Sequence, residues 1–371
     1  MMRRELVLRR RIGRGIQARH LGWALVAIGL LASMAALVYA YNHEQDDVNG
    51  SPVSTRWCAN QALPCSDVVT WSLNTSASNV NTTGGVPVQT AIQAAFTSWA
   101  QASLNGQLMT GLSFNQGADS SQNAPNASDC VNVIGFTDPT ASDFSTGTIA
   151  FTSLATLSGT PPQQSSCSSG ATVSCPLPSC IVDADIEFNP SDTFSTAPVT
   201  PTNDFDLQAI ATHEIGHLLG IDHSGLASAI MFAFGDAGIV PTRSLSIDDV
   251  LAAGSIYPSA NFPLTVGTLN GTVTLSSSGI FAAHVVVTDA DTGAAVTDGL
   301  TNSDGTYSIF APPGTYQVIA LPLSGVYNLG EFAGWACGYE ENGPPCCDPT
   351  SDPSCTAAAL SPPSNYSGKF H

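Results

Sequence analysis

The feature that most constrains this chain is the eleven-residue segment 213–223, His-Glu-Ile-Gly-His-Leu-Leu-Gly-Ile-Asp-His. Histidines four residues apart lie on one face of a helix, so His213 and His217 can hold one metal ion together. A third ligand must approach from another direction, and the helix therefore has to end. Gly220 permits the left-handed backbone that ends a helix, which allows His223 to turn back to the same ion.

The residue types of this segment favour a catalytic metal site. Three neutral imidazoles leave a fourth zinc position open for water, which is typical of catalytic rather than structural zinc. Glu214, beside the first ligand, is placed to act as general base on that water. A hydrogen-bonded core residue is the usual alternative for a lone histidine. It does not explain why the only three histidines between residues 44 and 283 all fall at ligand spacing.

The segment resembles the zinc motif of metzincin proteases, and Ser224 after the third histidine resembles the matrixin branch. Met231 resembles the methionine turn that lies beneath the zinc in that family, with an ordinary core methionine as the alternative. The resemblance covers roughly residues 55–258 and is strongest over 205–257. It implies an α+β catalytic domain, with a mixed twisted sheet and an active-site helix, that binds one catalytic zinc ion and hydrolyses peptide bonds of proteins.

The resemblance also implies where a substrate binds. Residues 148–151 resemble the edge strand along which matrixin substrates lie extended, so Ile149 and Ala150 are predicted to bind peptide by strand addition. The Pro-x-Tyr wall that usually follows the methionine turn is replaced by Phe232 and Phe234 around an alanine. These two side chains are therefore predicted substrate contacts, and we expect an altered specificity pocket.

Further metal sites are predicted from the strand before the active-site helix. Phe151 and Glu187 stand where the family usually has histidines of a second zinc site, so no second histidine-bound zinc is expected. Asp183 and Asp185 offer hard carboxylate oxygens that suit calcium. A solvated acidic strand edge is the alternative interpretation.

The N-terminal region predicts export from the cytoplasm. Residues 1–20 hold seven of the ten basic residues, and residues 21–41 carry no charge. The uncharged stretch is long enough to span a bilayer, with its basic flank in the cytoplasm. Residues 38–40, Val-Tyr-Ala, also suit signal-peptide cleavage. A cleaved signal and an uncleaved anchor remain open, and both place the rest of the chain outside the cytoplasm, secreted or membrane-anchored.

Cysteine usage agrees with that location, because all ten cysteines follow the apolar segment. Cys58 with Cys65 and Cys175 with Cys180 are close enough in sequence to form local pairs. Four more cysteines cluster in the tail: Cys337, Cys346, Cys347 and Cys355. A zinc site in this tail cluster is the alternative to disulfides, but no Cys-x-x-Cys spacing supports it.

Net charge limits the partners. From residue 41 onward three basic residues face 28 acidic residues. Such a surface repels phosphate backbones, so nucleic acid is not an expected partner. Protein or peptide substrates are expected, with membrane contact only through the N-terminal segment. The sequence leaves the oligomeric state open.

Apolar periodicity predicts the main elements. Alternating or apolar runs predict strands at 68–73, 131–136, 148–151 and 181–188, and helical spacing predicts helices at 88–99 and 205–219. Residues 245–250 and 256–257 resemble the last helix of the metzincin catalytic domain, which implies a further helix there. Asn203 or Asp204 is the predicted N-cap of the active-site helix. Residues 161–180, rich in Pro, Ser, Gly and Cys, are predicted to form a long disulfide-pinned loop.

A second domain is predicted after Pro263. Residues 264–325 resemble the carboxypeptidase regulatory-like, transthyretin-like β-sandwich, with short β-rich segments at 271–275, 284–288, 307–310 and 316–320. The expected organisation is a basic start at 1–20, an apolar segment at 21–41, a polar linker at 42–54, the protease domain at 55–258, a small all-β sandwich at 264–325 and an unassigned tail at 326–371.

A function of another class is a surface-binding or adhesion protein that uses the protease fold as a scaffold. Glu214 argues against it, because a scaffold has no need of a general base.

Overall fold

The computed structural model describes residues 43–48, 52–58, 68–74, 82–123, 125–136, 144, 147–238, 243–322 and 369–370. The predicted apolar segment at 21–41 and the tail cysteines lie outside these ranges. Among the described residues, no helix has the length and apolar character needed to cross a membrane.

A mixed five-stranded sheet forms the centre of the larger lobe, and it confirms the predicted α+β class. The sheet order is β7-β3-β8-β12-β9. Strands β3 (Val68–Leu73), β7 (Ser113–Gln116), β8 (Val133–Gly135) and β12 (Ser179–Phe188) are parallel, whereas β9 (Ala150–Ser158) pairs with β12 in the antiparallel direction. The last strand, β9, therefore forms one edge of the sheet.

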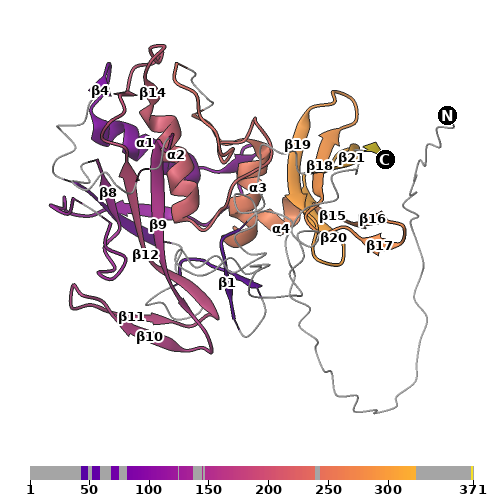
Figure 1. The fold of residues 1–371 in the computed structure, drawn as a ribbon, viewed down its shortest axis with the longest axis horizontal. Coiled ribbons are helices and arrows are strands. Elements are labelled where there is room, and N and C mark those ends of the chain that lie inside the picture. The colour runs from indigo at the N-terminus through magenta and orange to yellow at the C-terminus, as the bar shows by residue number, and fades with distance from the viewer. Residues whose placement is uncertain are drawn as a thin grey trace, which may run out of the picture.

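Two helices pack together against this sheet (Figure 1): α1 (Val88–Ala100) and α2 (Leu207–Leu218). The predicted apolar stripe of α1 is buried, and Trp71 of β3 stacks on Phe96 with ring centroids 4.6 Å apart. Trp99 is fully buried and its indole N–H donates to the Thr212 carbonyl of α2 (2.8 Å). Burial of these aromatic side chains fixes the active-site helix relative to the sheet.

The segment 161–180 is more regular than predicted. It contains an antiparallel hairpin, β10 (Gln163–Ser166) with β11 (Thr172–Cys175). The predicted Cys175–Cys180 disulfide is present, and a second disulfide joins Cys130 to Cys167. Buried cysteines of these disulfides form a small apolar cluster with Val173 and Val182. This cluster gives the otherwise polar hairpin a hydrophobic core. Cys58 is also disulfide-bonded, but its predicted partner lies outside the described residues.

The segment predicted as a linker at 42–54 instead contains an antiparallel pair of strands, β1 (Gln45–Asp47) and β2 (Pro52–Ser54), and the residues just before β1 contact the chain at the end of α2. His43 is buried and forms a β-bridge with Ile221, and Glu44 N–H donates to the Gly220 carbonyl (3.0 Å). These backbone bonds satisfy the end of α2. Polar composition suggested a linker, but the pairing partner lies more than 170 residues away in sequence.

Short strands complete the larger lobe: β4 (Thr82–Thr83), β5 (Ser103–Leu104), β6 (Gln107–Leu108), β13 (Phe194–Ser195) and β14 (Phe205–Asp206). Strand β13 lies between β14 and β4 in a small sheet. Helix α3 (Ile247–Ile256) occupies the predicted position of the last helix and begins with a capping box of Ser246 and Asp249.

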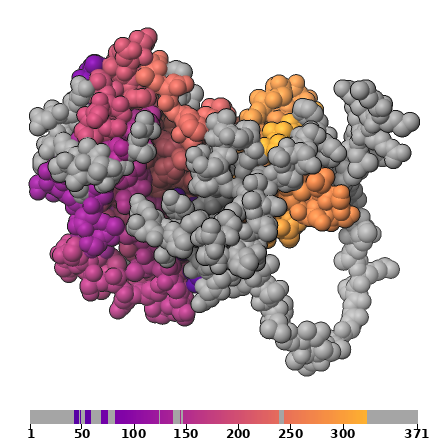
Figure 2. Space-filling view, in the orientation of Figure 1, coloured from indigo at the N-terminus to yellow at the C-terminus, as the bar shows by residue number. Residues whose placement is uncertain are grey.

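The C-terminal β region, residues 267–322, follows the short helix α4 (Phe262–Thr265) and forms a smaller lobe (Figures 1 and 2). Its strands are β15 (Gly267–Thr272), β16 (Thr274–Leu275), β17 (Ser278–Gly279), β18 (His284–Asp289), β19 (Ala295–Leu300), β20 (Thr306–Ala311) and β21 (Tyr316–Leu321), with β22 (Lys369–Phe370) added at the end. Antiparallel sheets of order β19-β18-β21-β22 and β15-β20 result.

The two lobes pack against each other through buried apolar residues. Val285, Val287 and Ile309 belong to the same buried cluster as the core of the larger lobe, and the Phe262 ring packs edge-on against Phe310. Strand β19, which sequence periodicity did not predict, contacts α3. Its polar residues Thr297 and Asp298 are buried because α3 covers them, so the strand lacks the polar-out alternation of a surface strand.

Candidate metal centre

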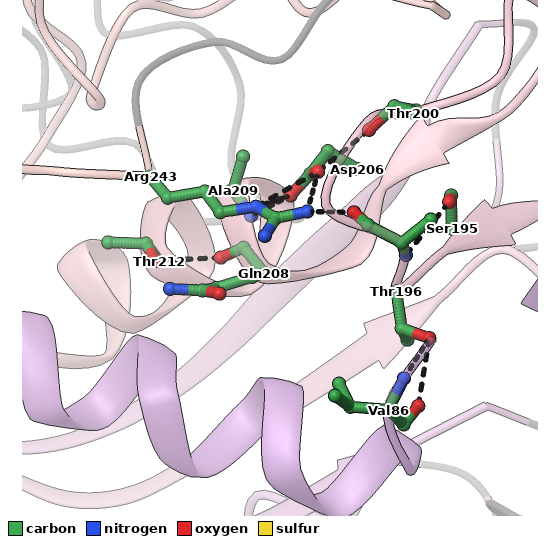
Figure 3. A network of polar contacts seen from close by, with 10 residues as sticks. Val86, Ser195, Thr196, Thr200, Asp206, Gln208, Ala209, Thr212 and Arg243 are labelled. Atoms are coloured by element: carbon green, nitrogen blue, oxygen red, sulfur yellow. Dashed lines mark hydrogen bonds and ion pairs between the residues drawn. The ribbon is translucent and has the colours of Figure 1, made fainter. Parts of the chain in front are cut away.

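Helix α2 is anchored at its start by the N-cap Asp206, which lies two residues beyond Asp204 and three beyond Asn203, the predicted caps. The Asp206 carboxylate accepts from Ala209 N–H (2.9 Å) and Thr200 Oγ1 (2.8 Å), as Figure 3 shows. It also pairs with Arg243, whose Nη2 lies 2.6 Å from Asp206 Oδ2. Neither Asn203 nor Asp204 caps the helix, because residues 205–206 form strand β14 and the helix begins only after them. A charged cap at the N-terminus also complements the helix dipole.

The end of α2 turns as its sequence requires. Gly220 has φ 81°, and a Cβ there would lie 2.8 Å from the Thr55 carbonyl oxygen. Ile221 N–H returns to the Gly216 carbonyl (3.0 Å), which reverses the chain and carries His223 back toward the helix.

The three predicted ligands converge. His217 Nε2 lies 3.2 Å from His213 Nε2 and 3.2 Å from His223 Nε2. Zinc–nitrogen bonds of about 2.0–2.1 Å at a tetrahedral angle separate two ligand nitrogens by about 3.3 Å. The spacing of the ring nitrogens therefore fits one zinc ion.

The tautomers of two rings strengthen that fit. His213 Nδ1 lies 2.8 Å from the Ile230 carbonyl oxygen, and His217 Nδ1 lies 2.9 Å from that of Ile221. Because a carbonyl only accepts, each ring donates from Nδ1 and keeps a lone pair on Nε2. Lone pairs that face one another at this distance repel, and a cation between them removes the repulsion.

Burial keeps these rings neutral. Desolvation, with a smaller contribution from neighbouring His223, lowers the pKa of His213 to about 3. Desolvation followed by the charges of His223 and His213 lowers the pKa of His217 well below its usual value. Neutral imidazole is the form that binds metal, so the site is prepared for a cation at neutral pH.

Glu214 lies on the same helix, buried, and faces the edge strand β9. Burial raises the pKa of Glu214 to about 7, and a hydrogen bond from Thr152 opposes the rise. Thr152 Oγ1 donates to Glu214 Oε2 (2.7 Å) and lies 3.0 Å from the Glu214 carbonyl oxygen. Sequence reasoning missed Thr152, because only the strand's position beside α2 gives it a role.

Thr152→Val should therefore shift the acid limb of the peptidase pH profile upward by about one pH unit, because the carboxylate loses a hydrogen bond that favours its charged form. The measurement is kcat/KM against pH for the wild type and the variant. Thr156→Val is the matched control, since Thr156 lies on the same strand but donates to Asp46. An acid limb that moves equally in both variants, or in neither, would refute the role of Thr152.

Met231, the residue of the predicted methionine turn, packs against helix α2. It is buried, and a Cβ at Gly216 would overlap the Met231 sulfur and reach within 3.0 Å of the Trp99 ring. Gly216 is thus needed for close approach of the methionine, at a position the motif leaves variable. Ser224 N–H donates to the Met231 carbonyl (2.8 Å), which closes the loop between His223 and the turn.

Asp249 of α3 holds the other side of that loop. Its carboxylate accepts from Ile230 N–H (2.9 Å) and Met231 N–H (3.1 Å), as well as from the Ser246 backbone (2.7 Å). The Ile230 carbonyl in turn orients the His213 ring. Asp249 therefore positions His213 indirectly, by holding Ile230 in place. The sequence placed Asp249 only in a helix.

Two of the segments predicted to contact substrate, residues 149–150 and 232–234, lie near one another. Ile149 precedes β9, and a Cβ at Gly235 would lie 3.6 Å from the Ile149 side chain, so the segment after Phe234 reaches that strand. Phe232 and Phe234 pack edge-on with ring centroids 5.8 Å apart, and Phe234 is 52% exposed. Their role as substrate contacts stays a prediction.

The acidic residues of β12 are not at a solvated strand edge, so that alternative was wrong. Asp183, Asp185 and Glu187 are all buried, on a strand that lies between β8 and β9. The backbone N–H groups of Asn126 and Val133 donate to Asp185, and that of Cys130 donates to Asp183. Glu187 pairs across the sheet with Phe151 and lies over Gly135. Asp183 Oδ1 is buried without a hydrogen-bond partner.

Within the described part of the chain, two groups of three metal-ligating side chains have all donor atoms within 4.8 Å of one another. One group is His213, His217 and His223, and the other combines His217 with Glu44 and Asp222. Neither contains Asp183 or Asp185, so calcium binding there stays a prediction.

Comparison with known proteins agrees with this geometry. Residues 148–258 match the family described as Matrixin. Three relatives are similar over short stretches: karilysin of Tannerella forsythia, 50% identical over 52 residues (14% of this chain and 10% of the relative); metalloendoproteinase 1 of Glycine max, 47% over 82 residues (21% and 25%); and the hatching enzyme of Paracentrotus lividus, 36% over 77 residues (21% and 12%). The chain thus spans a quarter or less of the length of these relatives.

The mixed sheet, helix α2 and the converging histidines resemble those of a metzincin-type protease domain. Residues 148–258 match the matrixin family, and together with the three relatives this match supports a matrixin-type protease.

Proposed function

We propose that this chain is a zinc-dependent endopeptidase that acts on proteins or peptides outside the cytoplasm. The observation that carries the proposal is the convergence of three histidine Nε2 atoms, 3.2 Å apart in two pairs, beside a buried glutamate and the edge strand β9 of the described sheet. Matrixin-family proteases are zinc-dependent, and His213, His217 and His223 would hold the ion here.

The chain's own residues divide the chemistry between them. When bound, zinc supplies Lewis acidity toward the peptide carbonyl and toward water. Glu214 takes a proton from the attacking water and returns it to the leaving amine. Thr152 keeps the Glu214 carboxylate oriented and favours its charged form. The Ile230 and Ile221 carbonyls hold the rings of His213 and His217 in the orientation that directs Nε2 at the metal position.

The experiment that tests this function is cleavage of casein and of a quenched peptide library by the full chain, produced under conditions that allow disulfides to form. We expect cleavage that a zinc chelator abolishes and added zinc restores. Cleavage that is insensitive to the chelator would assign a different mechanism. Absence of cleavage, with zinc bound, would favour the scaffold function.

Substrate would bind to β9 by strand addition. Ala150 pairs with Phe188, and Asn189 N–H donates to the Ile149 carbonyl (2.9 Å). In an antiparallel ladder this register turns the Ala150 N–H and C=O away from β12, toward the outer edge. A peptide laid along that edge would accept from Ala150.

Ala150→Pro should raise the peptide KM about 5- to 10-fold, because proline removes one edge donor, worth about 1 kcal/mol, without removing a bond to β12. The measurement is KM and kcat on a quenched peptide. Ala150→Val is the matched control, since it keeps the N–H. An unchanged KM in the proline variant would contradict strand addition at this edge.

Calcium binding at Asp183 and Asp185 is a separate proposal, supported by their buried, converging charge. Burial, then the charges of Asp185 and Asp129, raises the pKa of Asp183 to about 7, and burial raises that of Asp185 to about 6. A raised acid pKa means that the native state prefers the protonated form. The stabilising contribution is therefore present below the unfolded pKa of about 4 and is lost as pH rises through about 7.

Asp183→Asn should accordingly stabilise the metal-free protein at pH 8 by on the order of 2–3 kcal/mol and have little effect at pH 4. The measurement is denaturant unfolding at both pH values. If calcium binds, adding it at pH 8 raises the stability of the wild type but not of the variant. Equal responses of both proteins to calcium would remove Asp183 from any calcium site.

The location and the second lobe complete the proposal. Disulfides Cys130–Cys167 and Cys175–Cys180 suit an oxidising compartment, which supports a secreted or membrane-anchored protein. The antiparallel sheets of the C-terminal β region support an accessory β-sandwich.

A further inference from the structure

The C-terminal β region contacts the metal loop through one carboxylate. Asp298 of β19 accepts from Gly225 N–H at Oδ2 (3.0 Å) and from Ser224 Oγ at Oδ1 (3.2 Å). These are the two residues directly after His223. His284 of β18 approaches the same carboxylate, with Nε2 2.5 Å from Asp298 Oδ2.

Asp248 of α3 connects this contact to the larger lobe. Ser224 Oγ lies 2.7 Å from Asp248 Oδ2, while Thr297 Oγ1 (2.9 Å) and Asp298 N–H (3.1 Å) both donate to Asp248 Oδ1. All four side chains are buried. Buried charged hydrogen bonds cost much to break, because each lost partner leaves a desolvated group behind.

Packing leaves the loop no room to move away from Asp298. A Cβ at Gly225 would lie 2.6 Å from both Asp298 Oδ2 and His284 Nε2. Leu226 and Ala229 pack on Val286 of β18 in a buried apolar cluster. Residues 224–229 are therefore fixed on one side by the C-terminal β region.

This segment is also what positions the ligands. It runs from His223 to Ile230, whose carbonyl orients His213, and to Met231, whose carbonyl accepts from Ser224 N–H. A shift of Ser224 and Gly225 would move His223 directly and His213 through Ile230. Ligand geometry within a few tenths of an ångström determines zinc affinity.

We propose that Asp298, supported by His284, is a positioning residue of the metal centre, and that the C-terminal β region is thus an integral part of the catalytic unit. The proposal rests on the zinc-peptidase function proposed above. A simple role in holding two lobes together would stabilise the fold without setting ligand geometry, and the experiment separates the two.

The test compares full-length wild type with Asp298→Ala, Gly225→Ala and Asp304→Ala. Gly225→Ala keeps the Asp298 side chain, but the added methyl group would push the metal loop away from Asp298 and His284. Asp304→Ala is the matched control. Asp304 is an exposed aspartate of the same lobe, and its carboxylate accepts hydrogen bonds from the backbone and the hydroxyl of Thr306. The measurements are zinc affinity by chelator competition, the visible spectrum of the cobalt-substituted protein, and kcat and KM separately.

We expect Asp298→Ala and Gly225→Ala to weaken zinc affinity about 10-fold or more, to change the cobalt bands and to lower kcat with little change in KM. Asp304→Ala should match the wild type. If Asp298→Ala does not fold, Thr297→Val, which removes one hydroxyl from the same network, should show the same change of cobalt spectrum to a smaller degree.

Folded Asp298→Ala with wild-type zinc affinity and cobalt spectrum would overturn this proposal alone, even if stability falls. A wild-type chain that binds no zinc would overturn both this proposal and the peptidase function. A wild type that binds zinc but cleaves nothing would overturn only the peptidase function, since affinity and spectrum still report on Asp298.

Discussion

Glu214→Gln should lower kcat about 10²–10⁴-fold, because the amide cannot take a proton from the attacking water. Size and burial are preserved, and the Gln side chain can still accept from Thr152. Zinc affinity should stay near the wild-type value, since Glu214 stands beside the ligands and is not one of them. The measurement is kcat on a quenched peptide together with metal content.

Two comparisons make this result specific to the base. Glu214→Asp keeps the carboxylate but withdraws it by one methylene, so we expect activity between those of the wild type and the Gln variant. A Gln variant with wild-type kcat would exclude Glu214 as general base. A Gln variant that loses zinc would indicate that the glutamate supports the metal rather than the proton transfer.

Arg243→Met should destabilise the fold by about 3 kcal/mol, because it leaves the carboxylate of Asp206 buried without its cation. Asp206 is fully buried, whereas Arg243 is 26% exposed, which places the effect near the low end of the range for a broken buried ion pair. Arg243 also donates to the Ala197 carbonyl (2.6 Å), so residues 196–197 lose an anchor as well (Figure 3). Denaturant unfolding of metal-free protein measures the loss.

The double variant Asp206→Asn with Arg243→Met is the matched control. Asparagine keeps the N-cap acceptor for Ala209 N–H but carries no charge, so much of the lost stability should return. If the double variant is as unstable as Arg243→Met alone, the uncompensated charge is not the cause. A single Arg243→Met variant as stable as the wild type would show that water reaches Asp206.

The local sequence pattern was sufficient to predict an element wherever its structure depends mainly on residues close to it in the sequence. The apolar stripe at 88–99 predicted α1 almost to the residue, and apolar character predicted β3 at 68–73. The five-residue spacing of Cys175 and Cys180 predicted their disulfide. In each case the physical signal lies within a few residues.

Sequence reasoning failed where a distant segment changes the environment. Asp183 and Asp185 read as a solvated edge in the sequence, whereas the structure buries them with hydrogen bonds from the backbone of residues 126–133. The polar segment 42–54 looks like a linker until Ile221 offers it a backbone partner. Strand β19 was not predicted, because its buried Thr297 and Asp298 break the alternation that marks a strand.

The sequence by itself determined the candidate metal ligands, the candidate base and the turn at Gly220, because their spacing along one helix and its end already fixes the geometry. Only the tertiary structure decided what surrounds that site. Thr152 on β9, Asp206 with Arg243, Asp249 on α3 and Asp298 on β19 come from segments with no local link to the motif. Their roles arise from burial, which makes each hydrogen bond to the loop or helix costly to lose.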